Sequence, residues 1–99
     1  MLKETTFGST EAAKILAAML ETNYKTYAAK VSYAIQAFNT KLIALKEISD
    51  LRIRRSLLNL IMADAKSKIQ NSKFPDELKT FVLNVLARQF RKFIRKFGK

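Results

Sequence analysis

The chain has 99 residues, of which 48% are hydrophobic, and a formal net charge of +11. This length suits one domain with a single hydrophobic core and leaves no material for a second. Cysteine and histidine are both absent, which excludes disulfides, ordinary zinc or haem sites, and Cys/His or Ser/His nucleophile pairs. We therefore expect no metal, no cofactor and no catalytic residue, in a protein that is not an enzyme.

The positive charge is concentrated in the second half of the chain. Residues 1–50 contain six basic and five acidic side chains, whereas residues 51–99 contain thirteen and three. Such a field attracts nucleic-acid phosphate, an anionic membrane surface or an acidic protein, and charge alone does not rank these partners. A further interpretation is that the high net charge serves only the solubility of the protein.

No segment predicts secretion or membrane crossing. Residues 1–8 carry charged and hydroxyl side chains where a signal peptide has an apolar run, and we expect them to form a flexible N-terminus. The apolar runs at 15–20 and 81–87 are less than half of the ~18–20 residues that a membrane-spanning helix needs. Together with the lack of cysteine, these features favour a cytoplasmic protein.

The fold class predicted from the sequence is all-α. Between Gly8 and Pro75 there is neither a glycine nor a proline, and no segment alternates with a period of two over a useful length. We expect an antiparallel bundle of four helices, at about residues 10–21, 24–48, 51–71 and 75–97.

The segment 24–48 contains apolar residues at alternating steps of four and three, typical of a helix that packs along a partner. This seam consists of Tyr24, Ala28, Val31, Ile35, Phe38, Leu42 and Leu45. Its phase breaks near Thr22 and Asn23, so we expect a turn there. A continuous helix over residues 10–48 would be about 58 Å long, and its overhang beyond the other helices would predict a dimer or filament.

The last two helices have recognisable starts. Ser49 and Asp50 form the expected cap of segment 51–71, and Pro75 is the expected first residue of the final helix. Segment 51–71 has a wide apolar arc, which favours a central position in the bundle. The arc consists of Ile53, Leu57, Leu58, Leu60, Ile61, Met62, Ala65 and Ile69. The final helix is apolar nearly all round at its start only, so we expect burial to decrease toward its end.

The end of the chain is the first candidate binding site. In a helix, its six cations fall within an arc of about 140°, and four apolar residues fall within about 100° on the opposite side. The cations are Arg88, Arg91, Lys92, Arg95, Lys96 and Lys99, and the apolar residues are Phe90, Phe93, Ile94 and Phe97. Neighbouring cations on a helix repel one another, which favours an anion-binding surface over a merely solvated face. The apolar side has three alternative interpretations: part of the core, an oligomer contact or a membrane-facing stripe.

A second basic cluster lies in segment 51–71. Arg52, Arg55 and Lys66 share a narrow sector of the helix, and arginine suits bidentate contact with phosphate or carboxylate. A functional and a structural role are equally consistent with this sector. Arg54 instead falls among apolar positions, as expected for a buried or interfacial ion-pair partner.

Two further features have mainly structural interpretations. Tyr33 lies outside the seam, and packing against a neighbouring helix is favoured over stacking on a base. Asp64 and Lys68 are four residues apart in the favourable order and are expected to form an ion pair.

These observations favour a non-enzymatic bundle that binds nucleic-acid backbone with little sequence specificity, as a small subunit of a larger assembly. One alternative is a membrane-surface or bacteriocin-immunity-type bundle acting through its C-terminal amphipathic helix. Another is a scaffold or inhibitor that binds an acidic protein, and a homo-oligomer is compatible with each. In architecture alone, without a shared motif, the expected bundle resembles immunity proteins against pediocin-like bacteriocins and small subunits of CRISPR effector complexes.

Overall fold

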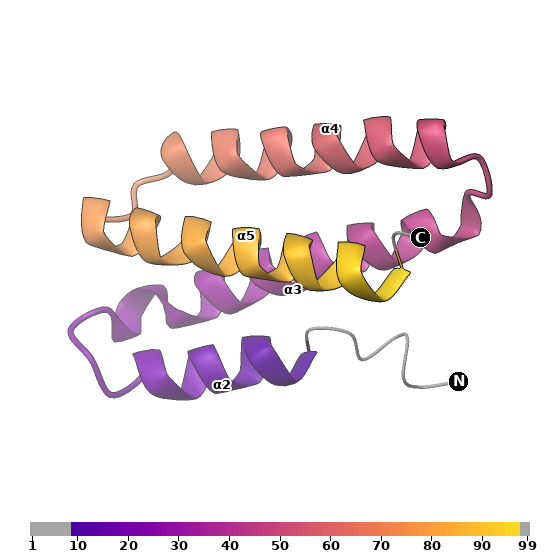
Figure 1. Ribbon diagram of the computed structural model, residues 1–99. Helices are drawn as coiled ribbons and strands as arrows, with labels where there is room; N and C mark the ends of the chain where they lie inside the picture. Colours follow the sequence, from indigo (N-terminus) through magenta and orange to yellow (C-terminus); the bar gives the residue numbers. More distant parts are fainter. Residues whose placement is uncertain (1–8, 98–99) are drawn as a thin grey trace.

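Four α-helices make up the part of the chain that the computed structural model describes, residues 9–97 (Figure 1). They are α2 (Ser9–Met19), α3 (Ala28–Ala44), α4 (Leu51–Gln70) and α5 (Asp76–Phe97), with short 3-10 helices η1 (Lys25–Tyr27) and η2 (Leu45–Glu47). The predicted all-α four-helix bundle is confirmed. The expectations for residues 1–8 and for Lys99 concern positions outside this range.

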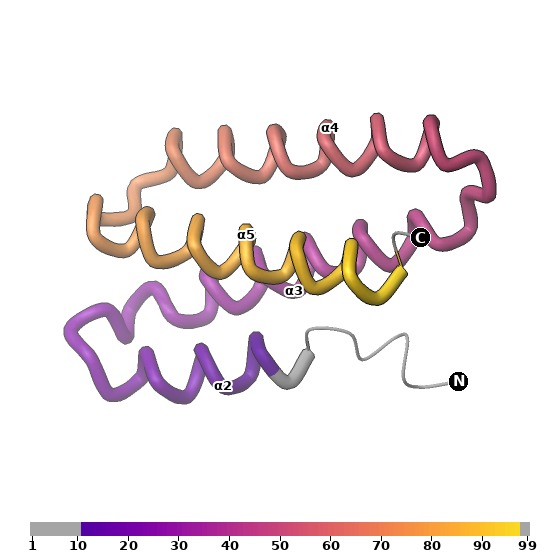
Figure 2. The backbone as a smooth tube through the Cα atoms, viewed as in Figure 1, coloured from indigo at the N-terminus to yellow at the C-terminus, as the bar shows by residue number. Residues whose placement is uncertain are grey.

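Helix α3 is the centre of the bundle. Successive helices are antiparallel and joined at alternating ends, and the backbone trace in Figure 2 shows α2 and α4 at opposite sides of the α3 and α5 pair. Helix α3 packs against α2, α4 and α5. The described bundle extends over 43 × 29 × 16 Å.

The apolar seam predicted for the second helix forms the core. All of its members from Ala28 to Leu45 are buried, and Val31, Ile35 and Leu42 are 0% exposed. Tyr24, at the start of the seam, is half-buried. A seam with a repeat of 3.5 residues keeps facing its neighbours along a whole helix, which explains how one helix reaches three partners.

The break near Thr22 and Asn23 is confirmed. Helix α2 ends at Met19, whose carbonyl accepts hydrogen bonds from both the hydroxyl and the backbone N–H of Thr22, at 2.8 and 3.0 Å. The backbone N–H of Tyr24 donates to the same hydroxyl at 3.1 Å. Because the chain turns here, the overhang expected for a continuous helix over residues 10–48 does not exist.

The expected central position of the third helix is wrong. Only Leu58, Met62 and Ile69 of α4 are buried, whereas Ile53 is 52% and Leu60 is 63% exposed. Helix α4 lies at the edge of the bundle, where α3 and α5 are the only long helices against it. Two neighbours cover a narrower arc than the apolar residues occupy, so part of the arc remains on the surface.

The ends of α4 and α5 follow the capping rules. The Asp50 carboxylate accepts hydrogen bonds from the backbone N–H groups of Arg52 and Ile53 at 2.9 and 3.3 Å, as an N-cap residue does. Helix α5 begins at Asp76, and the Pro75 carbonyl accepts from the N–H of Lys79 at 2.9 Å. Pro75 therefore precedes the helix by one residue instead of being its first residue.

Burial along α5 decreases toward its end only in part: Leu78, Val82, Val85 and Leu86 are buried in its first half, but Gln89 and Phe93 are buried in its second half. Phe93 is 0% exposed, whereas Phe81 near the start is 42% exposed. The two rings Phe93 and Phe97 contact each other with centroids 5.1 Å apart. The last turns of α5 are thus part of the core on one side.

A polar pair that the sequence analysis did not identify lies inside this core. The side-chain amide of Gln89 on α5 donates a 3.2 Å hydrogen bond to Asn39 Oδ1 on α3, and both residues are at most 2% exposed. Asn39 Nδ2 and Gln89 Oε1 have no partner among the described residues. A buried amide is costly when unpaired, so this pair favours one register of α5 on α3.

A double-mutant cycle tests the role of this amide pair. Asn39→Leu alone leaves the Gln89 amide without its acceptor and is expected to lower the free energy of unfolding by about 1–3 kcal/mol. Adding Gln89→Leu removes the stranded group, so the double variant is expected to recover to the wild-type value or above it. Urea unfolding followed by circular dichroism measures both. A double variant less stable than the single one would contradict this account.

Candidate anion-binding site

The exposed side of α5 carries cations that no acid neutralises. Arg91, Lys92 and Arg95 are exposed and have no ion pair or hydrogen bond with any residue in the range 9–97. Lys96 is also exposed, and its Nζ lies 5.5 Å from the centroid of the Phe97 ring, a cation–π distance. Because Phe93, on the opposite side of α5, is buried, these cations face the solvent.

Arg88 departs from the predicted site. Its Nη2 lies 2.7 Å from Glu11 Oε2 on α2, with the two side chains 48% and 22% exposed. An ion pair at this level of exposure contributes at most about 1 kcal/mol to the stability of the fold, but it neutralises the charge of Arg88. Arg88 therefore joins α5 to α2, and its expected role in anion binding is corrected.

The members of the second predicted cluster lie on the surface of α4. Arg52, Arg55 and Lys66 are exposed and unpaired within the described chain. Arg55 lines a groove together with Phe90 and Ile94 of α5, whereas Arg52 lines a separate hollow with Ile53 and Leu57 of α4. Lys66 lies about 16 Å farther along α4 than Arg55.

The antiparallel packing of α4 and α5 brings the two clusters together. Arg91 precedes Ile94 by three residues and therefore lies on the flank of α5 next to the groove, whereas Arg95 follows Arg88 by seven residues and lies on the side of α5 that also contacts α2. Residues close to the start of α4 and to the end of α5 are adjacent in the fold. We call Arg52, Arg55, Arg91 and Arg95 the arginine cluster.

The groove beside the arginine cluster, which we call the α4/α5 groove, has a volume of about 200 Å³. It is lined by Leu51, Arg54, Arg55, Leu58, Asn59, Phe90 and Ile94. Leu51 is 51% and Ile94 is 42% exposed, whereas Leu58 is buried. No acidic residue is among the lining residues.

Arg54 holds one end of this groove in place. Its guanidinium donates hydrogen bonds to three backbone carbonyls, those of Ile48 at 3.0 Å, Phe97 at 2.9 Å and Lys46 at 3.4 Å. Carbonyls near helix ends carry partial negative charge, so a cation suits this position. The expected ion pair of Arg54 is wrong, because backbone carbonyls take the place of a carboxylate.

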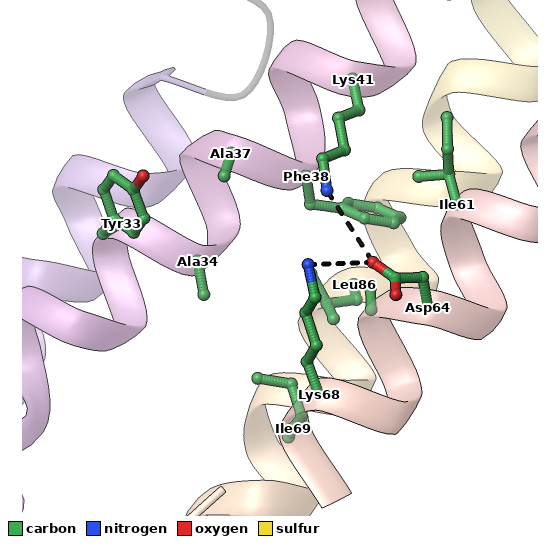
Figure 3. A pocket seen from close by; sticks show the side chains of 11 residues that line it. Tyr33, Ala34, Ala37, Phe38, Lys41, Ile61, Asp64, Lys68, Ile69 and Leu86 are labelled. Atoms are coloured by element: carbon green, nitrogen blue, oxygen red, sulfur yellow. Dashed lines mark ion pairs between the residues drawn. The ribbon is translucent and has the colours of Figure 1, made fainter. Parts of the chain in front are cut away.

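A second groove, on the other side of α4, has its cations neutralised. Figure 3 shows Lys41 of α3 and Lys68 of α4 directed toward Asp64, whose Oδ2 lies 3.9 and 3.1 Å from their Nζ atoms. The predicted Asp64–Lys68 pair is thereby confirmed. This groove has a volume of about 290 Å³ and a mainly apolar lining. With one carboxylate shared by two lysines, it attracts anions less than the α4/α5 groove does.

Tyr33 stands at the edge of this second groove (Figure 3). It is 74% exposed, so its expected packing against a neighbouring helix is wrong. The reason is that α3 presents Ala34 and Ala37 next to it, and these short side chains leave space between α3 and α4.

The apolar residues of the C-terminal segment divide between core and groove. Phe93 is fully buried, so its expected place on a contact surface is corrected, and Phe97 is partly buried against it. Phe90 and Ile94 line the α4/α5 groove. A membrane-facing stripe of all four residues is incompatible with this packing. None of the described helices is both long and apolar enough to span a bilayer.

No protein-family model, curated protein or solved structure matches this chain. Within residues 9–97, no group of three or more acidic side chains is placed to hold a metal ion. The functional proposal therefore rests on the chain's own geometry.

The structural role of Arg54 can be tested with its neighbour Arg55 as the control. Arg54→Ala removes three charge-assisted hydrogen bonds and is expected to lower the free energy of unfolding by about 1.5–3 kcal/mol. Arg55→Ala is expected to change it by less than about 0.5 kcal/mol. Urea unfolding measures stability, and amide hydrogen exchange in the last turn of α5 reports whether that turn frays. Equal losses in the two variants would rule out the proposed clamp.

Proposed function

We propose that this chain is a non-enzymatic basic bundle that binds the backbone of nucleic acid with little sequence specificity, as a small subunit of a larger assembly. The arginine cluster is the observation that carries the proposal: exposed arginines near the start of α4 and the end of α5, of which Arg55 lines the groove between these helices, have no neutralising acid among the described residues. Arginine donates paired hydrogen bonds that match phosphate oxygens. Phosphate contacts of this kind position a protein without reading sequence.

The repulsion inside the arginine cluster supports a bound anion. Arg52 and Arg55 are three residues apart, and Arg91 and Arg95 are four apart. Each like-charge pair at such a spacing costs about 0.2–0.5 kcal/mol in a helix. A phosphate between the side chains removes this repulsion, whereas a purely structural surface gains from an interleaved acid, as Asp64 provides in the other groove.

The spread of the cations favours an extended polyanion. Lys66 continues the basic sector of α4 about 16 Å beyond Arg55, a distance that several successive phosphates span. An anionic membrane is less well supported, because Phe93 is committed to the core. We place this function in the cytoplasm, in keeping with a chain that lacks cysteine.

The surface of α4 supports membership of a larger assembly. Ile53 and Leu60 are 52% and 63% exposed, and Leu57 is half-buried beside them. Exposed apolar residues that lie together on one helix face are typical of contacts with another subunit.

Fluorescence anisotropy with a labelled oligonucleotide tests the nucleic-acid proposal. Replacing the four residues of the arginine cluster by Gln is expected to abolish most binding and to reduce the slope of log affinity against log salt by about 3. The matched control is a quadruple Gln variant of exposed lysines elsewhere, which lowers the net charge equally. These lysines are Lys14, Lys25, Lys30 and Lys73.

The control is expected to keep most of the wild-type affinity and slope, because local phosphate contacts contribute more than distant charges do. The proposal fails if the wild-type chain does not bind at low salt, or if raising the salt leaves its affinity unchanged. Equal losses in the two quadruple variants would show that net charge acts without a defined site.

A further inference from the structure

The α4/α5 groove combines exposed apolar side chains with the arginine cluster. Leu51 and Ile94 are about half exposed, and Leu58 and Phe90 lie deeper. Contact with phosphate needs cations only, and a duplex presents phosphates while its base faces are stacked inside. The apolar floor therefore has no role in binding a duplex backbone.

An unpaired base has the complementary chemistry. Proteins that bind single strands combine a positively charged groove with aromatic or apolar surfaces that receive the flat faces of bases. The volume of about 200 Å³ is below the ~300–1,000 Å³ of pockets for drug-sized ligands, which fits one base. Asn59 lines the groove and has no hydrogen-bond partner among residues 9–97, so its amide offers a donor and an acceptor to a base edge.

We propose that the α4/α5 groove receives one unstacked base while the arginine cluster binds the adjacent phosphates, so that the chain prefers single-stranded to double-stranded nucleic acid. This inference rests on the proposed function and specifies its ligand. The groove between α3 and α4 is also apolar, but its lysines are paired with Asp64. Of these two grooves, the α4/α5 groove is the one that combines an apolar floor with an unpaired cation, Arg55.

Electrostatics alone predicts the opposite preference, for a duplex over a single strand, so the test distinguishes the two explanations. A duplex has the higher charge density, and each phosphate contact releases more counterions from a duplex than from a single strand. A basic surface without a base pocket therefore binds a duplex at least as tightly. A preference for single strands has to come from the bases.

The experiment compares three labelled probes at one low salt concentration by fluorescence anisotropy. They are an oligothymidine of roughly 12 nucleotides, within the site sizes of single-strand binders, the same backbone with abasic sites, and a blunt-ended duplex of the same length. The oligothymidine is expected to bind about 5- to 100-fold more tightly than the abasic strand, the effect of one stacked base. It is also expected to bind more tightly than the duplex.

Two variants test whether the α4/α5 groove is responsible for the preference for single strands with bases. Leu51→Ser with Ile94→Ser removes the exposed part of the groove floor and is expected to equalise the oligothymidine and abasic strands without changing the salt slope. Ile53→Ser with Leu60→Ser changes equally exposed residues on the outer face of α4 and is expected to keep the preference. Circular dichroism checks that both variants are folded.

The outcomes separate this inference from the proposed function. Equal, salt-dependent binding of all three probes, or tighter binding of the duplex, overturns the base pocket and leaves backbone binding in place. A preference that survives Leu51→Ser with Ile94→Ser also overturns it. No binding to any probe at low salt removes the proposed function, and the inference with it.

Discussion

The packing of α5 against α3 determines which side of α5 meets the solvent. Burying a phenylalanine such as Phe93 stabilises the fold by about 1.5–3 kcal/mol, whereas the repulsion between two neighbouring cations costs a few tenths. The apolar side therefore fixes the rotation of the helix. Arg91 and Arg95 face outward as a consequence, even though this arrangement places like charges together.

One local and one long-range interaction then fix the start of α4 and its position beside α5. Asp50 caps the start of α4, and Arg54 in the first turn donates to the carbonyl of Phe97 at the end of α5. Because the second contact joins residues 43 positions apart, it brings the basic start of one helix beside the basic end of the other. The arginine cluster depends on this alignment, since neither helix supplies it alone.

Features set by local periodicity were predictable from the sequence. The seam from Val31 to Leu42, the cap at Asp50 and the turn at Thr22 depend on residues close together in the chain. The edge position of α4 and the ion pair of Arg88 depend on which helices become neighbours, and a single helix does not encode this. Both halves of the arginine cluster were predicted as separate candidates, but the proximity of the start of α4 to the end of α5 depends on how the two helices pack.

The placement of acidic side chains decides where this basic surface remains uncompensated. Four acidic residues in the described range 9–97 are engaged in the scaffold: Glu11 with Arg88, Asp50 at a helix start, Asp64 with two lysines, and Glu77 as acceptor from the Tyr24 hydroxyl at 2.5 Å. The hydrogen bond to Glu77 raises the pKa of Tyr24, so the tyrosine stays protonated and keeps donating to α5. Each of these acids stabilises a junction between elements or a helix end. The α4/α5 groove has no acid in its lining, and the same distribution that holds the helices together therefore leaves Arg55 available to an external anion.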